Sequence, residues 1–409
     1  MFYINTKLEN NLLHSTFIIF VLLACLLEPD GISDGSSCGI DYFLSFHRLY
    51  SYVRYISFVT ALYLMLKIGI NGFSKMMMMI FLYHIVFIIS SIINKNLTNE
   101  MLFVEAKILS LSIMADYYMQ NVPLKFVKSL MFLLFIFVLL NLITLILFPN
   151  GMYTDNRWYS LNSFLGYKNR HIFYFLPCFL CFFLYEYINT GKYKFTFLLV
   201  SILLVSCLLN QSTTSLIVLA LLALSVFFLL KIKFPNWLNA NLVFWVGIGV
   251  SVVVIVMTIN GSFDQYSEQL TEVFEKEQNT MGANSRGLIW IESVIYVIKH
   301  PIIGNGDISF NLGWVWDVTQ AHNQYLDMAV IGGGVLVYVF LCQIFLLSKS
   351  MKKISNTEVF NCALFFLIVY STEFLSEGKR NNYLWFPSLI IIYYIPNMIT
   401  NSYQKHKMK

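Results

Sequence analysis

The sequence predicts an all-α integral membrane protein with about twelve transmembrane helices. Three observations predict this class: 58% of the 409 residues are hydrophobic, only 12% are charged, and the apolar residues form continuous blocks. Soluble domains carry roughly 25% charged residues. Blocks of about 16 to 25 apolar residues match a hydrocarbon core of ~30 Å. Because a chain in lipid must satisfy its own backbone hydrogen bonds, each block should be a helix.

Twelve apolar blocks follow one another along the chain. The fourth block carries Glu105, Lys107 and Asp116, so it is the least typical of a membrane span. The predicted helices are Leu12–Leu27, Tyr52–Ile70, Met76–Ile93, Met101–Met119, Val127–Phe148, His171–Ile188, Phe195–Leu209, Ser215–Leu230, Asn241–Ile259, Asn323–Leu347, Val359–Phe374 and Tyr383–Ile399.

One long segment, 260–322, has room for a folded piece outside the membrane. It divides the chain into helices one to nine (1–259), this loop, and helices ten to twelve with the C-terminus (323–409). The loop begins with acidic and apolar residues interleaved, which is typical of a short amphipathic helix. A second helix should begin near 284–285 and end before Pro301. Its apolar residues, which we expect to lie on the membrane, are Ile289, Trp290, Val294, Val297 and Ile298.

The lysines indicate how the helices are oriented. Positive charge concentrates on the cytoplasmic side of membrane proteins, and alternate connections in this chain are rich in lysine. With twelve crossings, both termini and all these lysines fall on the cytoplasmic side, and the loop 260–322 falls outside. The lysines are Lys7, Lys67, Lys75, Lys125, Lys128, Lys192, Lys194, Lys231, Lys233, Lys349, Lys352, Lys353, Lys405, Lys407 and Lys409.

The arginines show the opposite distribution. Orientation requires only positive charge, whereas the planar guanidinium suits bidentate binding of phosphate or carboxylate. The distribution therefore suggests an anion site on the outer side, although some arginines would simply pair with acids. Arg54, a charge near the outer end of a membrane helix without an evident partner, is a functional candidate. All six arginines fall on or near the outer side: Arg48, Arg54, Arg157, Arg170, Arg286 and Arg380.

Two side chains near the outer membrane boundary could carry chemistry. Arg286 falls in the first turn of the helix predicted to start near 284–285, where free N–H groups and the helix dipole favour an anion. His322 opens the tenth helix, and an imidazole, which titrates near neutral pH, could take a proton from a hydroxyl group. The glycines Gly332–Gly334 should let a neighbouring helix pack closely.

These residues form part of a longer pattern that resembles the O-antigen ligase and O-antigen polymerase superfamily. The pattern reads NSRGLIW (284–290), HPIIGNG (300–306), AHNQYL (321–326) and GG (333–334). The stretch GYKNR (166–170) also resembles a segment that precedes a membrane helix in many polymerases. These bacterial enzymes assemble surface polysaccharides from undecaprenyl-diphosphate-linked sugars at the outer face of the inner membrane.

The resemblance implies a GT-C-like fold with one large periplasmic loop between the ninth and tenth helices. It also implies an inverting glycosyl transfer that needs neither a metal nor a cofactor. Carried over to this chain, Arg286 would bind the lipid diphosphate and His322 would activate the attacking hydroxyl. The substrate-binding candidates are Arg170, Arg157, Asn323, Tyr325 and Arg380.

The chain departs from the superfamily at one position. Ligases and many polymerases carry a further arginine at the start of a middle helix, but the matching stretch here, 210–214, reads NQSTT. Threonine thus stands where that arginine would stand. Either Arg170 or Arg157 would then supply the second cation, and we prefer Arg170.

The function expected from the resemblance is a surface polysaccharide polymerase. It would transfer a growing glycan from undecaprenyl diphosphate to the terminal sugar of a lipid-linked repeat unit. One alternative is the ligase, which moves the glycan onto lipid A-core, and a second is a flippase or transporter for lipid-linked oligosaccharide. Candidate partners are membrane lipid, a chain-length regulator and a flippase. The scattered cations predict no nucleic-acid partner, and Cys178 and Cys181 form no metal pattern.

Overall fold

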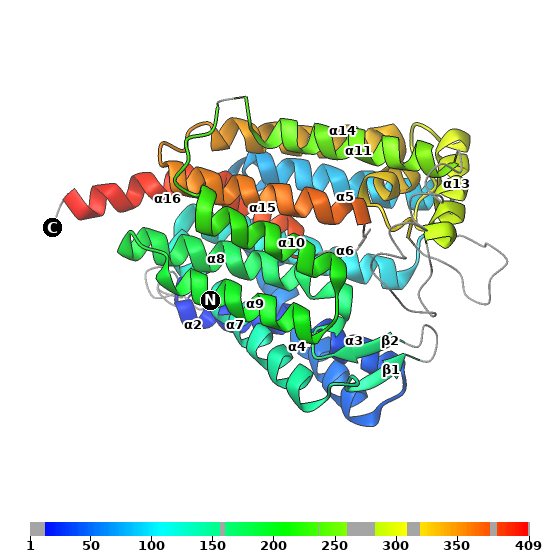
Figure 1. Ribbon diagram of the computed structural model, residues 1–409, viewed down its shortest axis with the longest axis horizontal. Coiled ribbons are helices and arrows are strands. Elements are labelled where there is room, and N and C mark those ends of the chain that lie inside the picture. The colour runs from blue at the N-terminus through cyan, green and yellow to red at the C-terminus, as the bar shows by residue number, and fades with distance from the viewer. Residues whose placement is uncertain are drawn as a thin grey trace, which may run out of the picture.

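The computed structural model of the protein describes residues 13–155, 160–235, 237–259, 283–308, 320–376 and 383–407. Within these residues almost all secondary structure is helical, and most helices run along one common direction (Figure 1). The predicted all-α fold class is therefore confirmed for the described residues.

In its described part, the first half of the chain contains six α-helices and a small sheet. They are α2 (Thr16–Leu26), α3 (Asp30–Ser37), α4 (Asp41–Ile68), the 3-10 turn η1 (Ile70–Gly72), α5 (Lys75–Ile93), α6 (Asn99–Asn121), α7 (Pro123–Leu147), β1 (Tyr153–Asp155), β2 (Ser160–Ser163), β3 (Gly166–Tyr167) and the 3-10 turn η2 (Lys168–Arg170).

The second half is helical throughout its described part. It contains α8 (Ile172–Thr190), α9 (Lys194–Leu209), α10 (Thr213–Leu224), the π-helical turn η3 (Ser225–Leu229), α11 (Ala240–Ile259), α13 (Ala283–Lys299), α14 (Gln324–Met351), α15 (Thr357–Ser376) and α16 (Trp385–Lys407).

Each of the twelve apolar blocks predicted from the sequence coincides with a helix. In the described part of the chain, eight helices are long and apolar enough to cross a membrane, and three shorter apolar helices accompany them. Helix α6, the charged fourth block, is the remaining one. The helices are thus confirmed, whereas the number of membrane crossings stays a prediction.

The charges of α6 face inward and have partners. Asp116 is fully buried and accepts hydrogen bonds from the backbone N–H of Ser74 and from the Tyr394 hydroxyl, both at 3.1 Å. Glu105 pairs with His84 of α5, and both side chains are buried. Because their partners compensate for desolvation, these carboxylates are compatible with a helix inside the bundle.

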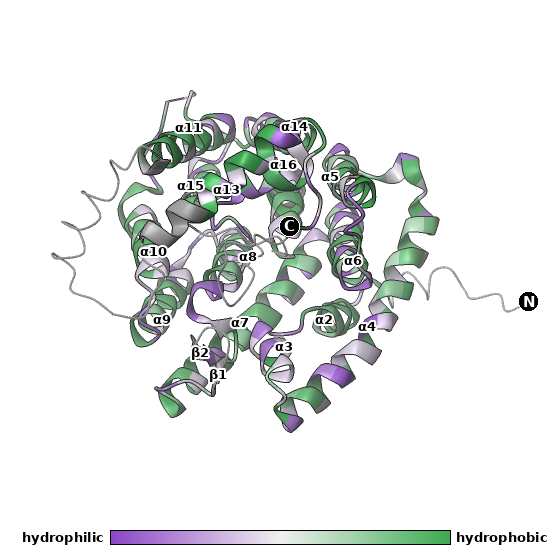
Figure 2. Ribbon diagram, turned by 90° about the vertical axis from the view of Figure 1, so that its right-hand side faces the viewer, coloured by the Kyte–Doolittle hydropathy of each residue, from purple (hydrophilic) through white to green (hydrophobic). Residues whose placement is uncertain are grey.

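The outward surface of the bundle is apolar. On α4, Tyr52 is 73% and Leu66 is 72% exposed, and Phe228 in η3 is 71% exposed. Viewed along the bundle in Figure 2, the outer helices carry mainly hydrophobic residues. Soluble monomers rarely expose such continuous apolar area, so this surface fits contact with lipid.

A small antiparallel sheet, which we did not predict, lies between α7 and α8. Its three strands pair in the order β1, β2, β3, with Tyr153 opposite Asn162 and Asn162 opposite Tyr167. The strands have only two to four residues. Such short strands show no alternating pattern that sequence could reveal.

Several interhelix connections meet at one end of the bundle, which we call the α13 end. Figure 1 shows α3, β1, β2 and α13 at this end and α16 running out at the opposite one. The lysine-rich connection from α8 to α9 lies at the opposite end (Figure 1), and the orientation in the membrane stays a prediction. Hydrogen bonds at the α13 end join Asn96 to Asn305, Asn210 to Lys168, Asn323 to Leu375, and Tyr383 to Asp30.

Candidate functional site

Helix α13 lies across the ends of α11 and α14 (Figure 1), and an apolar cluster holds it there. Ile289 and Trp290 are 0% and 5% exposed and pack against Ala321 and Leu326. For these two residues, the expectation that the apolar face lies on the membrane is wrong, because that face docks on protein. Ile298, farther along the helix, is 71% exposed.

Trp290 joins α13 to the start of α14 through a hydrogen bond. Its Nε1–H donates to the backbone carbonyl of Ala321 at 2.8 Å, and Ala321 directly precedes His322. Arg286 stands four residues before Trp290 in the same helix. The two positions therefore share a helix face, about 6 Å apart along the axis. The first turn of α13 is thus brought to the end of the bundle where His322 lies.

His322 adopts a left-handed backbone conformation, with φ of 50°. This conformation is uncommon for residues other than glycine. The next residue, Asn323, is the N-cap of α14 and accepts a hydrogen bond from the Leu326 N–H at 3.1 Å. Non-glycine residues keep such a conformation where their surroundings impose it, and functional sites are enriched in them.

Asp327, in the first turn of α14, binds the backbone of Ala321, the residue before His322. Its Oδ1 accepts the Ala321 N–H at 2.6 Å, and the side chain is fully buried. Both backbone polar groups of Ala321 are therefore bound, one by Asp327 and the other by Trp290.

The two substrate-binding candidates that follow His322 have partners inside the protein. Asn323 is 1% exposed, and its Oδ1 accepts a hydrogen bond from Ser251 of α11 at 3.1 Å. The Tyr325 hydroxyl contacts the Ser371 hydroxyl of α15 at 2.6 Å. These side chains tie α14 to α11 and α15 and so fix the helix that His322 precedes. Their contact with substrate stays a prediction.

Helix α14 is broken at Gly333, where φ is 61° and ψ is −160°. The segment that follows α13 fills the break with reciprocal backbone hydrogen bonds. The Gly334 N–H donates to the Pro301 carbonyl, and the Asn305 N–H donates to the Val330 carbonyl, both at 2.8 Å. The break therefore leaves these backbone groups satisfied, as a membrane environment requires.

Glycine is needed where the two segments meet. A β-carbon on Gly304 would come 2.5 Å from the Gly333 nitrogen, and one on Gly333 would come 2.4 Å from the Ile302 backbone. The triple glycine thus permits close packing, as predicted, but the neighbour is a non-helical segment rather than a helix.

Polar residues at the end of α5 bind both partners of this contact, α14 and the segment after α13. The Ser90 hydroxyl donates to the Ile331 carbonyl at 2.7 Å, and the Asn94 amide donates to the Gly304 carbonyl at 3.1 Å. Helix α13 is consequently anchored on α14 twice, through Trp290 and through the segment after its C-terminal end.

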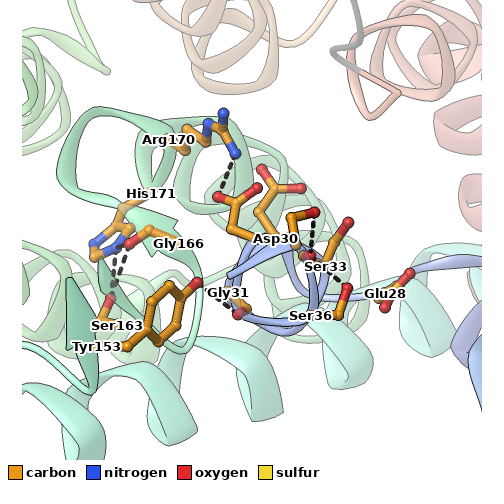
Figure 3. Close-up of polar contacts among 12 residues, drawn as sticks. Glu28, Asp30, Gly31, Ser33, Ser36, Tyr153, Ser163, Gly166, Arg170 and His171 are labelled. Atoms are coloured by element: carbon orange, nitrogen blue, oxygen red, sulfur yellow. Dashed lines mark hydrogen bonds and ion pairs between the residues drawn. The ribbon is translucent and has the colours of Figure 1, made fainter. Parts of the chain in front are cut away.

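Arg170 lies in a second polar cluster, next to α3. Figure 3 shows Arg170 above α3, and its Nη1 pairs with Asp34 Oδ2 at 2.5 Å. The two side chains are 40% and 29% exposed. The pair is therefore still open to solvent on one side.

Helix α3 is fixed against the small sheet. The Tyr153 hydroxyl donates to the Gly31 carbonyl at 2.7 Å (Figure 3). The Gly31 N–H donates to the Phe164 carbonyl at 3.2 Å. Burial raises the pKa of the Tyr153 phenol, and the nearby Asp34 carboxylate raises it further. The phenol thus stays neutral and can donate.

The stretch that lacks the expected arginine lies against the turn that carries Arg170. The Asn210 amide donates to the Lys168 carbonyl at 3.2 Å, and the Ser212 hydroxyl donates to Asn169 Oδ1 at 3.0 Å. Thr213, which follows, is exposed. The location agrees with the hypothesis that Arg170 compensates for the missing arginine, and its role in binding substrate stays a prediction.

Of the remaining arginine candidates, only Arg54 has a described side chain. Arg157 and Arg380 lie outside the described residues, and for Arg286 only the backbone is described. Arg54 is 3% exposed and pairs with Glu28 at 2.7 Å. The hypothesis that Arg54 lacks a partner is therefore wrong, because α2 is followed by a carboxylate that reaches it.

Sequence reasoning missed three contributors to this site. From the sequence, Trp290 is only an apolar residue of an amphipathic helix, and Asp327 and Ser90 do not stand out. Their roles depend on contacts between distant segments, for which a single sequence gives no signal. Among the described residues, no three His, Cys, Asp or Glu side chains are grouped so that they could hold a metal ion.

Comparison with known families agrees with the pattern at the α13 end. Residues 198–341 match the family model for the O-antigen ligase. The resemblance to the O-antigen ligase and polymerase superfamily is confirmed. A search of the curated proteins finds no match.

The matched segment runs from α9 into α14. It contains Arg286, Trp290 and His322 together with both sides of the α14 break, whereas Arg170 precedes it. Members of this O-antigen ligase family are membrane glycosyltransferase-like enzymes, and the apolar helices agree with a multi-pass membrane protein.

Proposed function

We propose that the protein is a surface polysaccharide polymerase. It transfers a growing glycan from undecaprenyl diphosphate to the terminal sugar of a newly arrived lipid-linked repeat unit, with inversion at the transferred carbon and without a metal. The observation that supports this most strongly is the contact of Trp290 with Ala321. It brings the helix of Arg286 to the residue before His322.

In the proposed reaction the hydroxyl oxygen of the acceptor sugar attacks the anomeric carbon of the donor. The new glycosidic bond forms as the bond from that carbon to the phosphate oxygen breaks, and the diphosphate leaves with the electron pair. His322 accepts the hydroxyl proton, and Arg286 stabilises the developing charge on the diphosphate. A diphosphate is already a good leaving group, so the enzyme mainly positions the reactants.

The proposed location is the bacterial inner membrane, with the α13 end in the periplasm and both termini in the cytoplasm. The lysine-rich connections at the opposite end support this orientation. A flippase that delivers repeat units and a regulator of chain length are the partners that this reaction would require at the same membrane.

A ligase that transfers the finished glycan to lipid A-core is the second candidate, and the description of the matching family favours it. Against it stands the threonine at the position of the middle-helix arginine. A transporter of lipid-linked oligosaccharide is a third possibility, but the break in α14 is filled by protein backbone rather than open to a ligand.

Gene deletion separates the first two candidates. Loss of a polymerase leaves one repeat unit on the lipid A-core, whereas loss of a ligase leaves none. Purified protein in liposomes, supplied with lipid-linked repeat units on the outside only, tests the third. The proposal predicts lipid-linked products of increasing mass; translocation without any gain in mass would contradict it.

A further inference from the structure

We propose that Trp290 and Asp327 are positioning residues that hold Ala321 from both sides and thereby fix the left-handed backbone of His322. This inference rests on the proposed function only for the role of His322 in catalysis. The fixing of the backbone itself follows from contacts among described residues.

The two hydrogen bonds to Ala321 are shielded from water. Ala321 and Asp327 are 0% exposed and Trp290 is 5% exposed. The Trp290 Nε1–H binds the Ala321 carbonyl at 2.8 Å, and Asp327 Oδ1 binds the Ala321 N–H at 2.6 Å. Hydrogen bonds in such surroundings are stronger than exposed ones, and a buried polar group that loses its partner is costly.

The backbone on the other side of His322 is fixed as well. Asn323 caps α14 and accepts a hydrogen bond from Ser251 of α11, and its carbonyl accepts the Asp327 N–H at 2.9 Å. His322 thus lies between the Ala321 carbonyl, which Trp290 binds, and Asn323, whose side chain and carbonyl are both bound. Its value of 50° follows from that arrangement rather than from the preference of histidine.

Trp290 would also set the relative position of the two proposed catalytic residues. It stands one helical turn after Arg286 and binds the residue before His322. A change that loosens this contact would alter the separation of the guanidinium from the imidazole. Small displacements of that kind reduce turnover more than substrate affinity, because catalysis depends on alignment.

The variant Trp290→Phe tests the inference because it removes the Nε1–H and keeps a buried ring. Trp385→Phe is a matched control, since Trp385 is also 5% exposed but packs at the start of α16 with Tyr370 and Phe374. Asp327→Asn keeps an oxygen acceptor for the Ala321 N–H, whereas Asp327→Leu removes it.

The first measurement is the rate at which diethyl pyrocarbonate modifies His322 in the purified full chain, followed by mass spectrometry. We expect Trp290→Phe and Asp327→Leu to raise this rate about fivefold, because each loses one buried hydrogen bond that restrains local opening. Trp385→Phe and Asp327→Asn should match the unaltered protein. Equal rates for Trp290→Phe and Trp385→Phe would overturn the inference.

The second measurement is glycan transfer. Trp290→Phe should lower kcat about tenfold and leave KM for the lipid-linked donor within about twofold, as expected for lost alignment. The modification rate is measured without substrate. It therefore tests the positioning of His322 independently of the proposed role of His322 in catalysis. An altered rate with full transfer activity would support the positioning of His322 and contradict its proposed role in catalysis.

Discussion

Gly304 lies so close to Gly333 that a β-carbon on Gly304 would come within 2.5 Å of the Gly333 nitrogen. Both residues have positive φ, 77° and 61°. The contact joins the segment after α13 to the break in α14, and it therefore contributes to the placement of α13 at the end of the bundle.

Replacing Gly304 with alanine should destabilise the protein by about 2 kcal/mol or more, because the new methyl group meets backbone and the conformation disfavours a side chain. Thermal unfolding in detergent would measure this effect. Gly249→Ala is the control, since Gly249 lies in α11 with no described atom within 4 Å of its β-position. Equal stability of the two variants would contradict the packing described.

Arg286→Lys should reduce transfer at least about tenfold, because lysine keeps the charge but loses the bidentate fork. Initial rates with a lipid-linked donor would measure the loss. Lys299→Arg, the reverse exchange in the last turn of α13, is the control and should leave transfer unchanged. Full activity of Arg286→Lys would show that bidentate binding is unnecessary.

Arg170→Gln distinguishes a substrate-binding arginine from a structural one. The Arg170–Asp34 pair is partly exposed, so its loss should cost stability only about 1 kcal/mol or less. If Arg170 supplies the second cation, KM for the lipid-linked donor should rise several-fold. Asp34→Asn should leave donor binding intact. A large loss of stability with an unchanged KM would instead assign Arg170 to the fold.

Arg54→Leu should destabilise the protein by about 3–5 kcal/mol, because it leaves the buried Glu28 carboxylate without its main counter-charge. The double variant Arg54→Leu with Glu28→Gln should recover much of this stability. It should also retain transfer activity, since the pair serves the fold. An inactive but stable double variant would return Arg54 to the functional candidates.

The sequence predicts the helices well because lipid admits few alternatives to a helix for an apolar block. Helix α6 shows where this reasoning weakens. Its charges make the block atypical, and only the structure shows that Asp116 and Glu105 face partners on other helices. Burial of such charges depends on tertiary contacts, which hydropathy does not record.

The candidate site was predictable in part. The motif pattern alone indicates that Arg286 and His322 belong to one site at the outer membrane boundary. The break at Gly333 and the bond from Trp290 to Ala321 were not predictable, because each depends on how the segment after α13 docks on α14. The partner of Arg54 was missed for the same reason.

We propose that Arg286 and His322 lie together on the outer side of the membrane. In a variant without native cysteines, cysteine introduced at both positions would be treated in intact cells with a membrane-impermeant maleimide and with a short bismaleimide. We expect labelling of both positions from outside and a cross-link between them. Labelling from opposite sides, or outside labelling without a cross-link, would contradict it.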